Sequence, residues 1–424
     1  MKLAKLLFLL LSINLTAQST WQPAPNIFSN PNGQRFDDVF FLNENLGWAA
    51  SGYYARIYKT TDGGLNWTEQ LNENNIPGGY YFRNIEFLNE DIGFIGTLNG
   101  TFFKTVDGGI NWAEVTNITP NPNAICGIDA VGTTTIYACG AYFNPAHIIK
   151  SIDSGDTWSF TDMSSYADGL VELLFLDELI GFAAGRASDG GMILKTIDGG
   201  LSWTEIYNTN LSGEYVWKLQ TLEGNSNVMF GAVSSVGVNN GKLIKSIDGG
   251  VNWQSFEAAE TEIQAVGFIT ENHGWMGGHT TGFQETLDGG QTWSDLNIGN
   301  NLNRIFIINS TTAYASGTTV YKYTEDTLGV EDLAQQDNQH LDIKILGNPV
   351  ETDLEFTINF ESDDNILIEL YDINGKFIRH LSRDIISQKK LKSYSFNVSN
   401  LASGTYFIDF HNNSGRSSLK FIKK

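Results

Sequence analysis

The chain has few cysteines, few basic residues and few long apolar runs. Its 424 residues include two cysteines, which are too few for a cysteine-based zinc site. Lysine and arginine number 26 against 48 aspartate and glutamate residues, which gives a formal net charge of -22. Nucleic-acid binding needs clustered basic side chains, so this balance argues against it. The same charge disfavours an anionic membrane surface.

A short apolar run lies near the N-terminus, at 6–13, after Lys2 and Lys5 and before Thr16-Ala17-Gln18. This order of basic residues, apolar run and small residues is typical of a secretory signal peptide, which we expect at 1–17. The run is too short to span a bilayer, which needs about 18 apolar residues or more. No later segment reaches that length, so the mature chain is expected outside the cell, or on its surface, without a transmembrane segment.

Glycine and aromatic residues are abundant, with 44 glycines, 10 tryptophans, 16 tyrosines and 26 phenylalanines. Such a composition favours many short strands joined by tight turns over helices. The hydrophobic fraction of 41% is sufficient for a folded core. We therefore expect an all-β protein.

One pattern recurs six times: Ser/Thr, any residue, Asp, any, Gly, any, a polar residue and Trp. The copies occupy 60–67, 105–112, 151–158, 196–203, 246–253 and 286–293. Successive aspartates are separated by 45, 46, 45, 50 and 40 residues. This period, together with strand-like content, indicates a β-propeller with one four-stranded blade per repeat. The aspartates are Asp62, Asp107, Asp153, Asp198, Asp248 and Asp288.

The chemistry of this box is that of a turn. The aspartate can accept hydrogen bonds from turn amides, and the glycine takes a positive φ without steric cost. The pair closes a β-hairpin. The tryptophan starts the next strand and can pack as a buried residue between neighbouring sheets. We interpret the six carboxylates as structural, because a function seldom needs six equal copies.

A seventh repeat at 304–323 is incomplete, because it lacks both the Gly-Gly pair and the tryptophan. Segment 21–24 precedes the first repeat and has no third strand of its own. We predict that it supplies the missing fourth strand, so that the chain ends pair in one blade and close the ring. The expected fold is a seven-bladed β-propeller over 18–326, closed by its N- and C-terminal strands.

The two cysteines, Cys126 and Cys139, fall on paired strands of the third blade. A turn near Gly132 would place them opposite each other, close enough for a disulfide. Two small buried thiols are the equally weighted alternative.

The box, Ser/Thr-x-Asp-x-Gly-x-Thr-Trp, is similar to the Asp-box, or bacterial neuraminidase repeat. This repeat occurs in sialidases, sortilin-type receptors, xyloglucan hydrolases and photosystem II assembly factors. The wider repeat, with Gly-aromatic and Lys-Thr-x-Asp-Gly-Gly, most resembles the assembly-factor propellers, which implies a non-enzymatic scaffold. The ligand does not follow, because these relatives perform unrelated tasks.

The C-terminal residues 341–424 carry Asn348-Pro349-Val350, Leu-Tyr-Asp-Ile-Asn-Gly at 370–375 and Leu-Ala-Ser-Gly-Thr-Tyr at 401–406. These motifs resemble the type A C-terminal sorting domain of type IX secretion substrates. The resemblance implies a small β-sandwich that engages the type IX machinery for export through the outer membrane. It does not say whether that domain is later cleaved. A polar linker is expected at 327–340.

Alignment of the repeats predicts a polar ring of mixed charge at the channel mouth, where the innermost strands begin. Asp37, Arg83, Lys218 and Asn303 share one ring position, and Asp38, Glu172 and Arg304 fall one residue later. Nearby loops carry aromatic residues, which can hold a sugar or a peptide or can pack among themselves. The loop aromatics are Tyr53, Tyr54, Tyr80, Tyr81, Tyr142, Phe143 and Trp217. The candidate ligand-binding residues are Asp37, Asp38, Arg83, Glu172, Lys218, Arg304 and Trp217.

Catalytic alternatives have less support. A sialidase needs an arginine triad, and the segment 82–85, Phe-Arg-Asn-Ile, lacks the proline of the sialidase motif. A xyloglucan hydrolase needs two opposed carboxylates, for which Asp37 and Asp38 qualify by position alone. No histidine has metal-ligand spacing, so neither a metal nor another cofactor is expected. The favoured function is a secreted or cell-surface, non-catalytic module that binds an extracellular protein or glycan. A glycoside hydrolase with carboxylates at the channel mouth is the alternative.

Overall fold

The computed structural model describes residues 20–324 apart from 77 and 144, and 342–424 apart from 361–362, 373–375, 389 and 413–414. The chain divides into two compact units, one of Ser19–Glu325 and one that contains Asp326–Lys424. The predicted signal peptide at 1–17 and the predicted linker at 327–340 lie outside the described residues.

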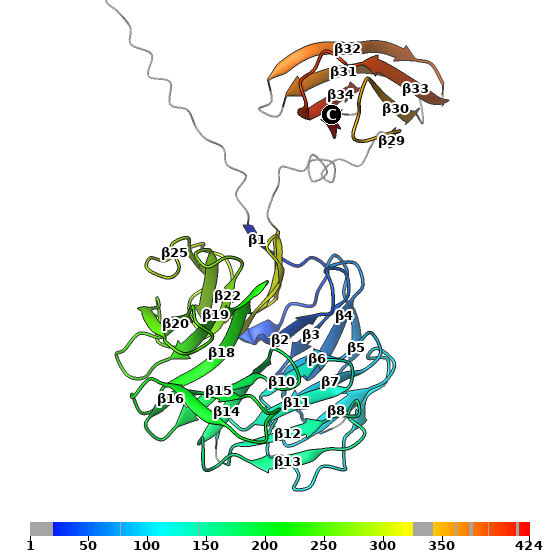
Figure 1. The fold of residues 1–424 in the computed structure, drawn as a ribbon. Coiled ribbons are helices and arrows are strands. Elements are labelled where there is room, and N and C mark those ends of the chain that lie inside the picture. The colour runs from blue at the N-terminus through cyan, green and yellow to red at the C-terminus, as the bar shows by residue number, and fades with distance from the viewer. Residues whose placement is uncertain are drawn as a thin grey trace, which may run out of the picture. The chain divides into compact units, whose positions relative to one another are not determined.

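Across the described part of Ser19–Glu325, the chain forms seven four-stranded antiparallel sheets (Figure 1). The innermost strands are β2 (Phe36–Phe41), β6 (Phe82–Phe87), β10 (Gly127–Val131), β14 (Gly169–Phe175), β18 (Tyr215–Leu222), β22 (Ile263–Phe268) and β26 (Arg304–Asn309). The second strands are β3 (Gly47–Ser51), β7 (Gly93–Thr97), β11 (Thr135–Gly140), β15 (Gly181–Ala187), β19 (Asn225–Ser234), β23 (Gly274–Gly278) and β27 (Thr312–Ser316). The third strands are β4 (Arg56–Thr60), β8 (Phe102–Thr105), β12 (His147–Ser151), β16 (Gly190–Thr196), β20 (Lys242–Ser246), β24 (Gln284–Thr286) and β28 (Val320–Thr324). The outer strands are β5 (Thr68–Leu71), β9 (Ala113–Glu114), β13 (Ser159–Asp162), β17 (Thr204–Asn208), β21 (Gln254–Glu257), β25 (Ser294–Asp295) and β1 (Thr20–Pro23).

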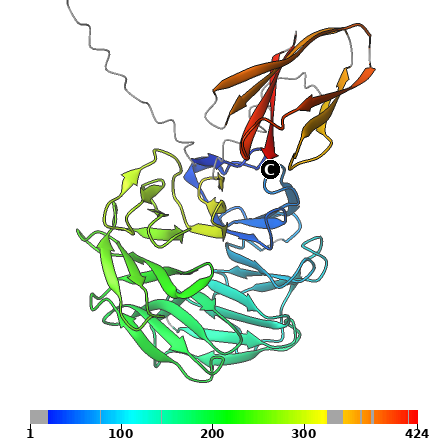
Figure 2. The ribbon, with the colours of Figure 1, turned by 45° about the horizontal axis from the view of Figure 1, so that its top comes forward.

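The outer strand of the last sheet comes from the opposite end of the unit. Strand β1 pairs antiparallel with β28, with Trp21 opposite Tyr323, and Figure 2 shows blue β1 beside yellow β28. A one-turn 3-10 helix, η1 (Pro31–Gly33), then leads into β2. The indole of Trp21 is fully buried and stacks on Phe283 of the preceding sheet at 4.2 Å between ring centroids.

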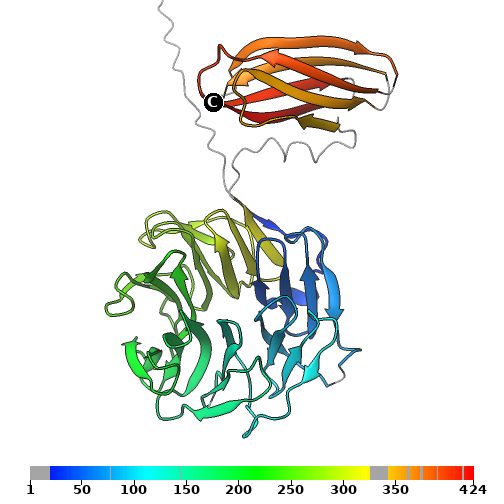
Figure 3. The same cartoon turned by 45° about the vertical axis from the view of Figure 1, so that its right-hand side comes forward.

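The innermost strands surround a common centre (Figure 3). They contact one another in the order β2, β6, β10, β14, β18, β22 and β26, and β26 contacts β2 again. Aromatic stacking fills the spaces between sheets, as with Trp48 on Phe87 and Tyr137 on Phe175, at 3.5 and 3.6 Å. The first unit is therefore all-β, with radially arranged sheets, as expected for a propeller.

Local hydrogen bonds form each box turn. In the first copy, the Thr60 hydroxyl donates to Asp62 Oδ1 at 2.9 Å and accepts from the Gly64 amide at 2.9 Å. The same carboxylate accepts from the amide and the side chain of Asn66 at 2.9 and 2.8 Å. The Gly64 φ of +84° explains the glycine, since other residues adopt that region only with strain. The box tryptophan lies just before the outer strand, and its indole N–H donates to the Gly64 carbonyl at 3.1 Å.

Each box is also held by the neighbouring sheet. A lysine of the third strand donates its ammonium to a glycine carbonyl of the next box in four of these junctions. The pairs are Lys59 to Gly108 (3.0 Å), Lys150 to Gly199 (2.9 Å), Lys195 to Gly249 (3.3 Å) and Lys322 to Gly63 (2.9 Å). The last pair joins the final sheet to the first.

Glu285 occupies the equivalent position in the sixth sheet, which precedes the sheet without a box. Its carboxylate accepts from the Trp275 indole at 3.0 Å and contacts the His273 ring at 3.0 Å. A lysine there would have no box carbonyl to bind. The exchange of lysine for glutamate thus matches the missing box of the seventh repeat.

The second unit contains two antiparallel sheets. One has the order β29 (Asp342–Ile345), β30 (Asp353–Phe360) and β33 (Lys390–Asn397). The other has the order β32 (Phe377–Ile386), β31 (Asp364–Asp372), β34 (Gly404–Asn412) and β35 (Gly415–Lys423). Buried residues of both sheets, among them Phe356, Ile368 and Phe410, form one hydrophobic core. Across the part of the chain that the structure describes, no helix is long and apolar enough to span a membrane.

Candidate functional site at the channel mouth

A β-bulge near the start of the innermost strands shapes the candidate site. In β2 the pairing skips from Phe36 to Asp38, and in β6 it skips from Phe82 to Asn84. A bulge leaves its extra residue unpaired and re-aims the neighbouring side chains. Two successive polar residues, such as Asp37 and Asp38, can therefore both lie near the channel.

The bulge also changes one assignment made from the sequence. In β18 the pairing skips from Val216 to Lys218, so Trp217 is the extra residue. Trp217 is thus equivalent to Asp37, and Lys218 is equivalent to Asp38. Placing Lys218 at the Asp37 position was wrong by one residue, because repeat alignment cannot locate the bulge.

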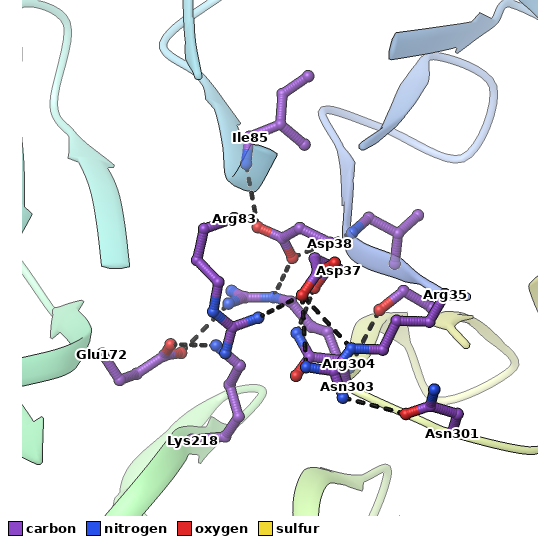
Figure 4. Close-up of polar contacts among 12 residues, drawn as sticks. Arg35, Asp37, Asp38, Arg83, Ile85, Glu172, Lys218, Asn301, Asn303 and Arg304 are labelled. Atoms are coloured by element: carbon purple, nitrogen blue, oxygen red, sulfur yellow. Dashed lines mark hydrogen bonds and ion pairs between the residues drawn. The ribbon is translucent and has the colours of Figure 1, made fainter. Parts of the chain in front are cut away.

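The side chains of the ring point toward one another (Figure 4). At the bulge position, Asp37 Oδ1 binds Arg83 at 3.2 Å and Arg35 at 3.3 Å. The Asn303 side-chain amide donates to the Asp37 carbonyl. Arg83 also lies over the Trp217 ring, 5.6 Å from its centroid. Asp37 is thus shared between two guanidinium groups.

A second set of ion pairs links the residues that follow the bulge. Arg304 binds Glu172 at 3.2 Å and Asp38 at 3.4 Å, and Lys218 binds Glu172 at 2.7 Å. Asp38 also accepts a hydrogen bond from the Ile85 amide at 3.1 Å. These contacts join sheets that are distant in sequence across the channel.

Burial makes the ring's charges depend on one another. Burial raises the pKa of Asp38, and the nearby Arg304 guanidinium opposes that rise. Burial lowers the pKa of Lys218, and the Glu172 carboxylate opposes it. Removing one partner would leave an uncompensated buried charge. The ring therefore acts electrostatically as one unit.

Two carboxylates deeper in the channel were missed by the sequence reasoning. Glu86 and Asp129 each lie two residues beyond the position equivalent to Asp38, so strand alternation places them on the channel side. Burial raises the pKa of Glu86 well above its usual value, and the neighbouring Asp129 adds to the effect. Burial likewise raises the pKa of Asp129. Counting two residues on from the position equivalent to Asp38 in each repeat would have identified both carboxylates from the sequence.

A small cavity adjoins the ring on the side of the later sheets. Its volume is about 210 Å³, and its lining includes Glu172, Lys218 and Arg304 with Leu174 and Phe306. The polar ends of the three ring residues form one part of its wall, and the apolar residues form another. The volume is smaller than the roughly 300–1,000 Å³ of sites for drug-sized ligands.

The cysteines are free, buried thiols in this structure. Cys126 precedes β10, and Gly127 is the residue paired with Cys139. The expected direct opposition of the two cysteines is therefore wrong by one residue. Burial raises the pKa of both thiols.

The box carboxylates lie in their own turns, each bound by the Ser or Thr that opens its box. The carboxylates are those of Asp62, Asp107, Asp153, Asp198, Asp248 and Asp288. Within the described ranges, no group of three or more His, Cys, Asp or Glu side chains could hold a metal ion.

The N-terminal and C-terminal parts of the chain are similar to different protein families. Residues 344–424 match the family model of the secretion system C-terminal sorting domain. Residues 14–159 match that of the photosynthesis system II assembly factor YCF48. A search of curated proteins gave no match.

Solved structures with the same fold include two of YCF48 and one of PorZ. "YCF48 bound to D1 peptide" is 20% identical, with a TM-score of 0.56, and the alignment covers 72% of this chain and 97% of that one. YCF48 from Cyanidioschyzon merolae is 17% identical, with a TM-score of 0.57 and coverage of 72% and 98%. PorZ, a surface component of the type-IX secretion system of Porphyromonas gingivalis, is 13% identical, with a TM-score of 0.54 and coverage of 94% and 61%.

At these identities the solved structures establish the fold alone, while the sorting-domain match indicates export of the protein to the cell surface or the medium. The chain thus joins a propeller similar to the photosynthesis system II assembly factor YCF48 to a C-terminal secretion sorting domain.

Proposed function

We propose that this protein is a non-catalytic binding or scaffolding module, exported by the type IX secretion machinery, whose partner is an extracellular protein or glycan. The observation that carries the proposal is the presence, in one chain, of a propeller and a segment at 344–424 that matches a sorting domain. A relative with this fold was solved with a peptide bound, which supports a protein partner.

The proposed layout has four parts. A signal peptide at 1–17 is removed, and a propeller occupies 18–326, followed by a linker at 327–340 and a sorting domain at 341–424. The propeller is taken to have seven blades, closed by β1 in the last one. The pairing of β1 with β28 and the bond from Lys322 to Gly63 support closure.

The ring remains a proposed ligand site, and its residues differ in how far their side chains are exposed. The side chains of Asp37, Arg83 and Glu172 are 5% exposed or less and are already ion-paired. The Arg304 side chain is also ion-paired, with Glu172 and Asp38, but it is 21% exposed, and Trp217 is half-buried. We therefore expect a partner to reach Arg304 and Trp217, while Asp37, Asp38, Arg83, Glu172 and Lys218 hold the mouth in shape.

The absence of enzymatic activity is argued from the same pairing. A glycoside hydrolase needs one carboxyl group to act as an acid and another as a base or nucleophile. The mouth carboxylates Asp37, Asp38 and Glu172 are each bound to a cationic side chain. The raised pKa values of Glu86 and Asp129 in the channel are one observation that favours the alternative, a glycoside hydrolase.

Two experiments test the proposal. Export is tested in a bacterium with a type IX secretion system, by comparing the full chain with a chain that lacks 341–424. The full chain should reach the surface or the medium, and the truncated chain should stay in the periplasm. Equal export of both would contradict the assignment of the sorting domain.

Catalysis is tested with a panel of fluorogenic glycosides. We expect no turnover by the purified protein. Turnover that disappears in the Glu86→Gln or Asp129→Asn variant would replace the binding proposal with a hydrolase. The Gln254→Ala variant, changed at an exposed position of the outer strand β21, serves as the control.

A further inference from the structure

A small aromatic pocket lies on the loops of the first two sheets, and none of the ring residues lines it. The loop after β3 supplies Tyr53 and Tyr54, and the loop before β6 supplies Glu73, Ile76 and Tyr80. The pocket has a volume of about 160 Å³. This is well below the roughly 300–1,000 Å³ of drug-sized sites, so the pocket suits a single ring of a ligand.

The pocket's rings are held in place by their neighbours. Tyr53 and Tyr54 meet edge to face, with centroids 5.1 Å apart and planes at 84°. The Tyr54 hydroxyl donates to the Pro31 carbonyl at 3.3 Å, and Tyr80 packs edge-on against Phe103 at 5.1 Å. Tyr53 nevertheless remains 59% exposed. An apolar ring face is therefore available to a ligand without rearrangement.

A fixed carboxylate lies at the edge of the same pocket. Arg56 binds Glu73 through two hydrogen bonds, from Nε to Oε2 at 3.1 Å and from Nη2 to Oε1 at 2.9 Å. This bidentate contact lowers the pKa of Glu73, so the group is ionised at neutral pH. Each carboxylate oxygen can accept a further hydrogen bond, because it has a second lone pair.

The local charges restrict the class of ligand. Arg56 already neutralises Glu73 and lies 5.9 Å from the Tyr54 centroid and 4.8 Å from that of Phe28, so a cationic ligand would meet a resident cation. An anion would meet Glu73 and also Glu69, 3.7 Å from Arg56, on a chain of net charge -22. A neutral ligand with an apolar face and hydroxyl donors fits both the rings and the carboxylate.

From this geometry we propose that the pocket of Tyr53, Tyr54, Glu73 and Tyr80 binds a neutral pyranose of an extracellular glycan. The C–H face of the sugar stacks on Tyr53, and its hydroxyl groups donate to Glu73. The inference rests on the proposed binding function and gives it a ligand class and a site. It places that site in a pocket on two loops, which no residue of the ion-paired ring lines.

The test is titration of the full-length mature protein with soluble neutral oligosaccharides built from glucose, xylose, mannose, galactose and N-acetylglucosamine. Binding is followed by calorimetry and by saturation-transfer NMR. We expect at least one of them to bind. Tyr53→Ala should weaken it by about tenfold or more, the equivalent of about 1.4 kcal/mol. Tyr53→Phe should stay close to the wild type, because it keeps the stacking face.

Glu73→Gln should also weaken binding, because a neutral amide is a poorer acceptor than a carboxylate. Tyr166→Ala is the matched control, since Tyr166 is a 40% exposed tyrosine on another loop, and its affinity should not change. The proposal is overturned if no neutral oligosaccharide binds at millimolar concentration, or if Tyr53→Ala binds as tightly as the wild type.

The state of the oligosaccharide after incubation distinguishes failure of the sugar site from failure of the non-catalytic proposal. Mass spectrometry of the oligosaccharide after incubation should show it intact. If the sugar is bound and cleaved, the sugar site stands and the non-catalytic proposal fails. If no sugar binds, but a defined surface protein is captured equally by the wild type and Tyr53→Ala, the sugar site fails and the binding module stands.

Discussion

The proposed closure of the ring by β1 makes a prediction for Trp21. Its side chain is fully buried and contacts Phe283, Trp275 and Tyr323 at 4.2, 5.4 and 5.5 Å between centroids. Replacing a buried tryptophan with alanine costs roughly 3–5 kcal/mol. Small folded units are stable by about 5–15 kcal/mol, so Trp21→Ala should remove a large part of the stability of the propeller.

The assay is urea unfolding of the full-length mature chain, followed by tryptophan fluorescence. All 10 tryptophans lie within Ser19–Glu325, so the signal reports on the propeller even with the second unit attached. Gln254→Ala, an exposed position on the outer strand β21, is the control and should change stability by less than about 0.5 kcal/mol. A loss below about 1 kcal/mol for Trp21→Ala would refute closure by β1.

Three further predictions concern the ring, the boxes and the cysteines. Lys218→Met should destabilise the protein in urea unfolding because Glu172 loses one of its two cationic partners, but by less than the roughly 3–5 kcal/mol of an uncompensated buried charge because Arg304 still pairs with Glu172, and adding Glu172→Gln should recover part of that loss. The turn amide and side chain that donate to Asp248 lower its pKa to about 2. Since the unfolded value is about 3.9, the stability from this carboxylate is complete above about pH 4 and is lost as pH falls toward 2. The Asp248→Asn variant should therefore unfold with a weaker dependence on pH in that window, and an unchanged dependence would contradict the turn role. Cys126 and Cys139 should both resist a thiol reagent in the native protein and react as two thiols in denaturant, whereas a lack of reaction in denaturant would show a disulfide.

The parts that the sequence predicted well are local or repeated. The hydrogen bonds of Thr60, Asp62 and Trp67 that form the first box turn join residues within 60–67. The turn can therefore be predicted from eight consecutive residues. The repeat then carries the same strand order through the unit. The all-β class and the sorting domain could be inferred for the same reason, because motif residues lie close together in sequence.

The burial of the box tryptophans could not be predicted from the repeat. They were expected to pack between sheets as buried residues, yet only Trp67 and Trp203 are buried, and the other four are half-buried. Whether an indole is covered depends on the neighbouring sheet, which differs from one junction to the next. Trp67, for example, belongs to a core cluster that includes Tyr314 and Val320 of the last sheet.

The sequence brought several ring residues together at the mouth but did not give their ion pairs, and it missed Arg35, Glu86 and Asp129. Repeat alignment brought Asp38, Glu172 and Arg304 to one level, and the structure joins them by ion pairs. It misplaced Lys218, because the bulge at Trp217 shows only in the pairing with β19. The repeat pattern does not show which carboxylate forms an ion pair with which basic side chain across the channel.

The sequence by itself determined the box turns, the strand order and the two-part design, since each depends on residues within about one repeat of each other. Tertiary structure decided the rest. It assigned the partners of Asp37 and Glu172, the shift of Lys218 and the pocket where Tyr53 and Glu73 meet. The ion pairs join residues far apart in the chain, so they exist only after the sheets have packed around their common centre. The shift of Lys218 and the pocket depend on strand pairing and loop conformation, which the repeat pattern does not specify.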